Sequence, residues 1–377
     1  MKDVQNSKAD PDSSQTTNST LFPNNPYNFT DLKPTTNQYH KYPVINLSFE
    51  CFIAVDSFKE AVKFYKRVVH RLFKDHKYLT KSERLSLHDR KLVQFWSDDH
   101  NFYTFSTEQV MKGLRELTRL ICRHWDSRCW VLLDDYDHVV QAAMMEMADN
   151  DKFRRVVKFT YRMITHAFRN NSDCVYGAVV AGELSLAVFG VKDYVKYKMY
   201  NFLEDHEFVK YFGLTSEDVE GVLYSLSKNK TFRTEVEKNC GGYITSSGEK
   251  LFNINLLNRF LNGEKSNHGS EVKDELRNIV KIPLFREILE TLLEGETVDF
   301  HKIDVFDLDD LVDLRSILLN IDLEITPRIF NLLISYLFHK GILAYSEPTN
   351  QTANTMNISY AKIPNNYMKE AIKSVLY

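Results

Sequence analysis

The sequence alternates short apolar strands with amphipathic helices from residue 43 onward, and this order limits the possible folds more than any other feature. The apolar runs predict strands at residues 44–49, 130–133 and 174–181. Helices are predicted to begin after the capping boxes Ser57 with Glu60 and Ser106 with Gln109, and over residues 152–169. Alternating strands and helices predict an α/β domain over residues 43–200, with a parallel sheet covered on both faces.

The segments on either side of this domain have different patterns. Residues 1–42 are rich in Asn, Ser, Thr and Pro, so we expect a disordered tail that buries too little apolar surface to fold. Residues 201–300 are mainly helical in pattern. Residues 301–377 contain a helix, a turn at Gly341, a strand pair and a last helix, which predicts a winged-helix-like unit.

Charge, glycine and cysteine usage restrict the classes of function. A formal net charge of -3 gives no global electrostatic reason to bind nucleic acid or an anionic membrane. All 13 glycines lie at or after Gly113 and none is followed by lysine, so the sequence has no phosphate loop of the G-x-x-x-x-G-K-[ST] kind. Five scattered cysteines without C-x-x-C spacing favour a reducing compartment over a disulfide scaffold or a zinc ribbon.

The N-terminus and the longest apolar stretch bear on localisation. Residues 1–9 are polar and lack the apolar region of a signal peptide. Residues 175–191 are interrupted by Glu183 and are too short and polar for a spanning helix. We therefore expect an intracellular protein, cytoplasmic or nuclear, that is neither secreted nor in a membrane.

Two carboxylates follow the second predicted strand. The run from Val131 to Asp135 has the form of a Walker B strand, in which one acid holds a magnesium-bound water and the next orients the attacking water. Acids at the end of a strand also commonly cap or solvate the helix that follows. Taken alone, the pattern leaves both interpretations open.

The chain resembles the AAA-ATPase-like family whose members are often fused to a PD-(D/E)XK nuclease. The resemblance covers residues 43–377 in family order. It is carried by Ile45–Ser48, the helix from Ser57 to Leu79, Val131–Asp137, Tyr211–Val219, Gly242-Tyr243 and Lys362–Asn365. It implies a P-loop NTPase-type core, followed by a helical region and a winged-helix-like unit.

The departures from the family pattern point to a degenerate member. The family's phosphate loop is replaced by the Asn/Thr-rich tail, and the nuclease module does not follow Tyr377. Asp135 stands where the family has its catalytic glutamate, and Ala181-Gly182-Glu183 replaces a basic or hydroxyl set. Only Asp134 carries over, as a vestigial metal-site residue, so we expect no working catalytic, cofactor or metal site.

One other set of residues could contact a ligand. Arg154, Lys158, Arg162 and His166 form a basic stripe on the helix 152–169, opposite its apolar face. A solvated face explains the stripe, and a phosphate or nucleic-acid contact by Arg154, Lys158 and Arg162 is the alternative. The last helix offers only Lys369 and Lys373 to DNA.

These observations predict a catalytically inactive binding or regulatory module with no cofactor. Its partner would be a protein or a second copy of the chain. One alternative is an ATP-hydrolysing NTPase whose phosphate loop is missing by truncation, and another is a nucleic-acid-binding protein. Because the strand 174–181 is apolar throughout, we also expect its edge to be covered by another segment of this chain, with a partner chain as the functional alternative.

Overall fold

The computed structural model describes residues 41–51, 54–187, 198–201, 203–204, 208, 212–227, 230–263, 270–319, 321, 324–346 and 358–377. The predicted disordered tail therefore lies almost entirely outside the described residues. The chain divides into two compact units. Among the described residues, the first unit holds 41–140 and 155–182, and the second holds 141–154, 183–187 and the residues from 198 onward.

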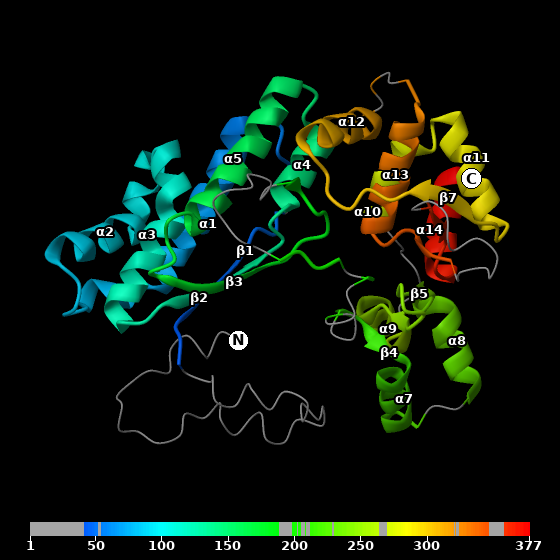
Figure 1. The fold of residues 1–377 in the computed structure, drawn as a ribbon, viewed down its shortest axis with the longest axis horizontal. Helices are drawn as coiled ribbons and strands as arrows, with labels where there is room; N and C mark the ends of the chain where they lie inside the picture. Colours follow the sequence, from blue (N-terminus) through cyan, green and yellow to red (C-terminus); the bar gives the residue numbers. More distant parts are fainter. Residues whose placement is uncertain are drawn as a thin grey trace. The chain divides into compact units, whose positions relative to one another are not determined.

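The first unit contains the predicted parallel sheet. Its three strands are β1 (Val44–Ser48), β2 (Cys129–Asp134) and β3 (Val175–Val180), in the order β1-β2-β3 (Figure 1). Ile45 pairs with Val131, and Leu133 pairs with Val180. The prediction of an α/β fold with a parallel sheet is confirmed, and β2 lies in the middle.

Helices pack on one face of this sheet. They are α1 (Phe58–Asp75), α3 (Thr107–Trp125) and α5 (Asn150–Phe168). Gly113 allows α3 to approach α1, because a Cβ there would lie 2.5 Å from a methyl carbon of Val69. The Tyr65 hydroxyl lies 2.7 Å from the Thr160 hydroxyl and links α1 to α5.

Of the two predicted capping boxes, that of Ser106 forms completely and that of Ser57 forms by half, because the Glu60 carboxylate pairs with Lys63 instead. Ser57 accepts a hydrogen bond from the Glu60 amide, and Ser106 and Gln109 form the complete capping box. The unit also contains elements that the sequence pattern did not single out. They are the 3-10 helices η5 (Lys77–Lys81) and η6 (Asp99–Thr104) and the helix α2 (Leu87–Ser97). Helix α4 (His138–Glu146), the helix expected after the two carboxylates, extends into the second unit.

The opposite face of the sheet is open in the part of the chain that the structure describes. Asn46 is exposed, Trp130 and Leu132 are half-buried, and Val179 is 55% exposed. Helices of the described segments shield only the face that carries Ile45 and Val131, so the expected cover on both faces is found on one face alone among the described residues. Parallel sheets are usually covered on both sides, so the open face is unusual.

The second unit begins with a small α/β subdomain. Its strands β4 (Leu214–Thr215), β5 (Tyr243–Ile244) and β6 (Lys250–Phe252) form an antiparallel sheet in the order β4-β6-β5. Three helices complete it: α7 (Ser216–Ser225), α8 (Lys230–Cys240) and α9 (Ile254–Leu261). The core includes Val219, Val236 and Phe252, and Thr215 caps α7 as the sequence predicts.

The rest of the second unit follows the order two helices, strand, two helices, strand pair, helix. The elements are α10 (Ser270–Ile279), α11 (Pro283–Leu293), β7 (Val298–His301), α12 (Leu308–Leu318), α13 (Pro327–His339), β8 (Ala344–Tyr345), β9 (Ile358–Lys362) and α14 (Asn366–Leu376). The strands form an antiparallel sheet in the order β7-β9-β8, so the predicted strand pair is present.

A buried arginine ties α12 to the segment after α4. Arg315 is 1% exposed, and its guanidinium donates to the carbonyl oxygens of Met147 and Ala148 at 2.7 and 2.6 Å and to the Asn150 side chain. The same guanidinium lies 5.8 Å from the centre of the Phe153 ring. Burial lowers the pKa of Arg315, and the three acceptors explain how the charge is held inside the protein.

Among the described helices, none has the length and apolar character needed to cross a membrane.

Candidate functional site

The two predicted site carboxylates lie at the carboxyl edge of the parallel sheet. Asp134 is the last residue of β2 and is exposed, and its Oδ1 accepts a hydrogen bond from the Asp135 amide at 3.0 Å. Asp135 has a φ of 54°, in the left-handed region that few non-glycine residues adopt. Ser48, at the end of β1, donates its hydroxyl to Asp135 Oδ2 at 2.9 Å. The side chains of two neighbouring strand ends therefore meet, as in the ligand-binding edge of open α/β sheets.

The residues after these carboxylates pack tightly against the end of β3. Asp137 is fully buried, and a Cβ at Gly182 would lie 2.3 Å from its Oδ1 and 2.7 Å from the ring of Tyr136. The Tyr136 amide donates to the Ala181 carbonyl at 3.2 Å. Glycine at residue 182 is thus required by the packing of this edge.

The carboxyl edge offers few ligands for a metal. His138 Nε2 lies 3.8 Å from Asp135 Oδ1. In the described segments, no three His, Cys, Asp or Glu side chains form a group that could hold a metal ion. Burial raises the pKa of Cys129 to about 12 and that of Cys122 to about 11, so these two thiols stay protonated at neutral pH.

The edge strand β3 is a second candidate binding feature of the first unit, after the carboxyl edge of the sheet. It lies at one edge of the sheet, and no other strand in the described residues pairs with its far side. The Ala181 amide, just after the strand, donates to the Leu133 carbonyl at 2.8 Å. Because backbone groups alternate sides along a strand, those of Ala178 and Val180 face the far side. The exposed residues Tyr176 and Val179 flank this edge.

An aromatic group lies at the amino end of the open face. The Tyr42 and Tyr176 rings are 4.3 Å apart between centroids, and the Trp130 ring is 5.4 Å from that of Tyr176. The Arg128 guanidinium lies 4.8 Å from the centre of the Tyr176 ring. The rings of Tyr42, Tyr176 and Trp130 therefore form an apolar surface beside the edge of β3.

The predicted basic stripe divides into residues with different surroundings. Arg154 forms an ion pair with Asp309 at 2.7 Å, which accounts for its position without a ligand. Lys158 and Arg162 are exposed on α5. Sequence reasoning missed Lys112, Arg115 and Arg119 on α3, although their spacing of three and four residues places them on one helix face.

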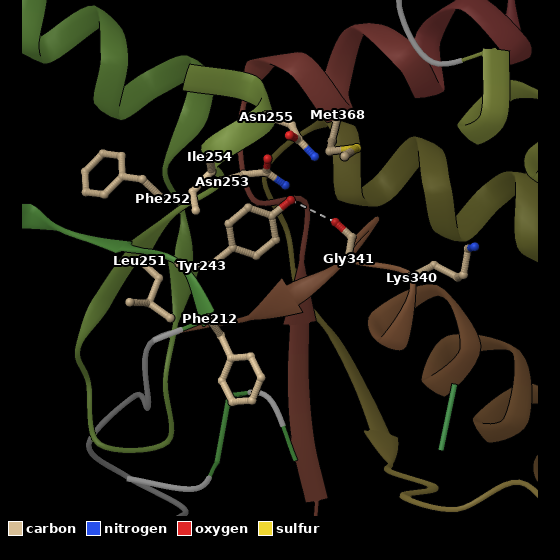
Figure 2. Close-up of a pocket in the computed structure, with 11 residues that line it drawn as sticks. Phe212, Tyr243, Leu251, Phe252, Asn253, Ile254, Asn255, Lys340, Gly341 and Met368 are labelled. Atoms are coloured by element: carbon tan, nitrogen blue, oxygen red, sulfur yellow. Dashed lines mark hydrogen bonds between the residues drawn. The ribbon is translucent and has the colours of Figure 1, made fainter. Parts of the chain in front are cut away.

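A cavity of about 340 Å³ lies in the second unit (Figure 2). Its lining is largely apolar and comprises Phe212, Gly213, Tyr243, Leu251, Phe252, Asn253, Ile254, Asn255, Lys340, Gly341 and Met368. Tyr243 donates its hydroxyl to the Gly341 carbonyl at 3.0 Å, and burial raises its pKa to about 12, so the hydroxyl stays neutral.

Two further polar side chains of the cavity lining have partners within the protein. Asn253 accepts a hydrogen bond from the Leu256 amide and caps α9. Lys340 points away from the Tyr243 ring and pairs with Glu183 and with Glu275, the latter at 2.9 Å. Tyr243, Asn253 and Lys340 are therefore engaged in contacts within the protein.

Helix α13 has little exposed surface in the second unit. Leu332 through Phe338 are buried without interruption. Arg328, near its start, pairs with Asp310 and Asp313. A helix that enters a DNA groove needs an exposed row of side chains, and α13 does not present one.

The sequence matches no known family model, and no curated protein or solved structure shows significant similarity to it.

Proposed function

We propose that this chain is a protein-binding module built on a degenerate AAA-like core, and that its partner adds an extended strand to the far edge of β3. The observation that carries the proposal is the far edge of β3, with which no strand of the described residues pairs. A strand edge of this kind binds an extended segment through main-chain hydrogen bonds, and pockets beside it accept alternate side chains.

The chemistry around β3 defines the partner segment. Ala178 and Val180 offer backbone donors and acceptors, whereas Tyr176 and Val179 offer apolar side chains at 42% and 55% exposure. A partner strand with apolar residues at alternate positions would bury the side chains of Tyr176 and Val179. Its main chain would form hydrogen bonds with the backbone groups of Ala178 and Val180. The proposed occupant is therefore an extended apolar segment of a partner polypeptide.

The architecture supports an AAA-like origin. A strand ending in two carboxylates lies between two parallel neighbours, which agrees with the position of a Walker B strand. The order α11, β7, α12, α13, β8, β9 agrees with a winged-helix-like unit. We propose that the module acts by binding, since the sequence has no glycine-lysine loop to hold a triphosphate.

A proline substitution tests the strand addition. Ala178→Pro removes an amide that faces the far edge and leaves the hydrogen bonds to β2 in place. Peptides would be selected from a random display library on the wild-type chain, and their affinities measured by fluorescence anisotropy. Ala178→Val is the matched control, because it changes the same side chain and keeps the amide.

We expect selected peptides to alternate apolar residues and to lose at least tenfold in affinity for Ala178→Pro, with little change for Ala178→Val. Equal affinities for the wild type and Ala178→Pro would disprove strand addition at β3. Circular dichroism and thermal unfolding of both variants would establish that each is folded before the comparison.

A further inference from the structure

Two helices of the first unit bring cationic side chains to one surface. On α3, Lys112, Arg115 and Arg119 follow at intervals of three and four residues. On α5 and just beyond its end, cationic side chains recur with the same spacing, at Arg162, His166 and Arg169. Side chains with this spacing share one face of a helix.

Direct contacts join the two rows. The Arg115 guanidinium donates to the carbonyl of Asn170 at 3.3 Å, directly after Arg169. The Asn171 side chain donates to the Thr118 hydroxyl of α3 at 2.8 Å. The carboxyl end of α5 is thus fixed against the middle of α3, and the cations of the two helices lie close together.

The electrostatics of this region show the effect of the clustering. Burial lowers the pKa of His166, and the positive charges of Arg115, Lys112, Arg169 and Arg162 lower it further. Burial also lowers the pKa of Arg115, with additional repulsion from Arg119 and Arg169. Each helix therefore lies in the positive field of the other.

Acidic residues neutralise only part of this charge. Glu108 pairs with Lys112 at 2.6 Å. Glu116 lies near Lys112 and Arg119 and accepts a hydrogen bond from the Trp96 indole at 3.2 Å, and burial raises its pKa. Glu108 and Glu116 thus lie beside the α3 row, and the positive charges that act on His166 and Arg115 favour an anionic partner.

We propose that Lys112, Arg115, Arg119, Arg162 and Arg169, the α3–α5 basic patch, bind the phosphate backbone of nucleic acid without reading its bases. Each row of cations extends about 10 Å along its helix at 1.5 Å per residue, which suits a repeating array of phosphates better than a single anion. This site is separate from the β3 edge and does not depend on strand addition.

The surroundings of the patch favour backbone contacts over other partners. No large apolar or aromatic side chain within the described helices α3 and α5 is strongly exposed. Membrane association of a basic helix requires apolar side chains that insert among the lipids. Recognition of single-stranded bases requires aromatic rings on which the bases stack. The patch has the charge for phosphates and neither of these additional features.

Charge reversal at two exposed residues of the patch tests the proposal. The full chain and the double variant Lys112→Glu/Arg162→Glu would be titrated into fluorescently labelled 20-base-pair duplexes of two unrelated sequences, with binding measured by anisotropy. Lys59→Glu/Lys91→Glu is the matched control, because both lysines are exposed in the same unit and the net charge changes equally.

Binding should be equal for the two duplexes and strongly dependent on salt. If three to five phosphates are neutralised, raising the salt from 50 to 200 mM weakens affinity roughly 40- to 500-fold. The Lys112→Glu/Arg162→Glu variant should bind at least tenfold more weakly at 100 mM salt, with a salt slope shallower by about 2. The control should remain within about threefold of the wild type, as expected when only long-range charge changes.

Three results would overturn the assignment. The first is absence of duplex binding at 50 mM salt, and the second is equal weakening by the patch variant and the control. The third is co-sedimentation with phosphatidylserine vesicles in the absence of duplex binding, which would assign the patch to a membrane surface instead.

Discussion

The indole ring of Trp130 occupies the space that a side chain at Gly177 would need. A Cβ at residue 177 would lie 2.6 Å from Cζ3 of the ring and 2.7 Å from Cη2. The two residues pair directly across β2 and β3, so the absence of a side chain on β3 lets the large ring on β2 lie over the neighbouring strand. This contact shapes the open face beside the proposed binding edge.

Gly177→Ala should destabilise the protein by about 1–3 kcal/mol, because the added methyl group collides with a half-buried ring. Urea unfolding followed by circular dichroism would measure the change. Gly221→Ala is the control: its Cβ would meet nothing within 4 Å, and its place in helix α7 predicts stabilisation by up to about 1 kcal/mol. Equal effects of the two substitutions would contradict the Trp130 contact.

Arg315→Met should lower the free energy of unfolding by about 3 kcal/mol or more, since it leaves the Met147 and Ala148 carbonyls without their donor. Arg328→Met removes a half-exposed arginine that pairs with Asp310 and Asp313 and should cost about 1 kcal/mol or less. Parallel urea titrations would compare the variants. A loss for Arg315→Met no larger than that for Arg328→Met would contradict the structural role of the buried guanidinium.

The stability of the protein should depend on pH through His76. Burial lowers its pKa from the ordinary 6.5 to about 4, and its Nε2 has no hydrogen-bond partner. Between these values the unfolded chain binds the proton and the folded chain does not, so stability falls as pH drops from about 6.5 to about 4. The expected contribution is about 3 kcal/mol.

Comparing wild type with His76→Gln isolates this contribution, because glutamine does not titrate. Urea unfolding would be measured at pH 7.5, 6, 5 and 4. The difference in stability between the two proteins should change in favour of the variant as the pH falls. A difference that stays constant across this range would show that the His76 pKa is not lowered in the folded state.

The carboxyl edge of the sheet should tolerate loss of charge. We expect calorimetry with Mg-ATP to detect no micromolar binding. Asp134→Asn should change stability by only about 0.5 kcal/mol, since Asp134 is exposed and asparagine can still accept the Asp135 amide. ATPase activity in the purified protein that disappears with Asp134→Asn would establish the catalytic alternative instead.

Local patterns allowed the sequence to predict many elements. The strand predicted at 130–133 is β2, Cys129–Asp134, and the helix predicted at 152–169 is α5, Asn150–Phe168. Ser57, Ser106 and Thr215 cap helices as predicted. These features depend on residues within one or two turns of each other, so hydrophobic periodicity and capping chemistry are enough to identify them.

Local sequence patterns predicted only some of the candidate site residues. Asp134 and Asp135 could be placed at a sheet edge from the strand that precedes them. The contact of Asp135 with Ser48 joins residues 87 positions apart, and that of Arg115 with Asn170 joins residues 55 positions apart. Neither contact leaves a local pattern, so the spacing of the α3 cations shows a charged helix face in the sequence but not that this face lies beside the cations of α5.

The strand-helix order, the helix caps and the lack of a glycine-lysine loop follow from neighbouring residues in the sequence, and the alternation of strands with helices is enough to imply a parallel sheet. Tertiary structure decided which face of the sheet is covered, that β3 lies at its edge, and that the cations of α3 and α5 share one surface. Those outcomes depend on how separate helices and strands pack against each other. That packing is set by the volume and charge of side chains that are far apart in the sequence and meet only in the folded chain.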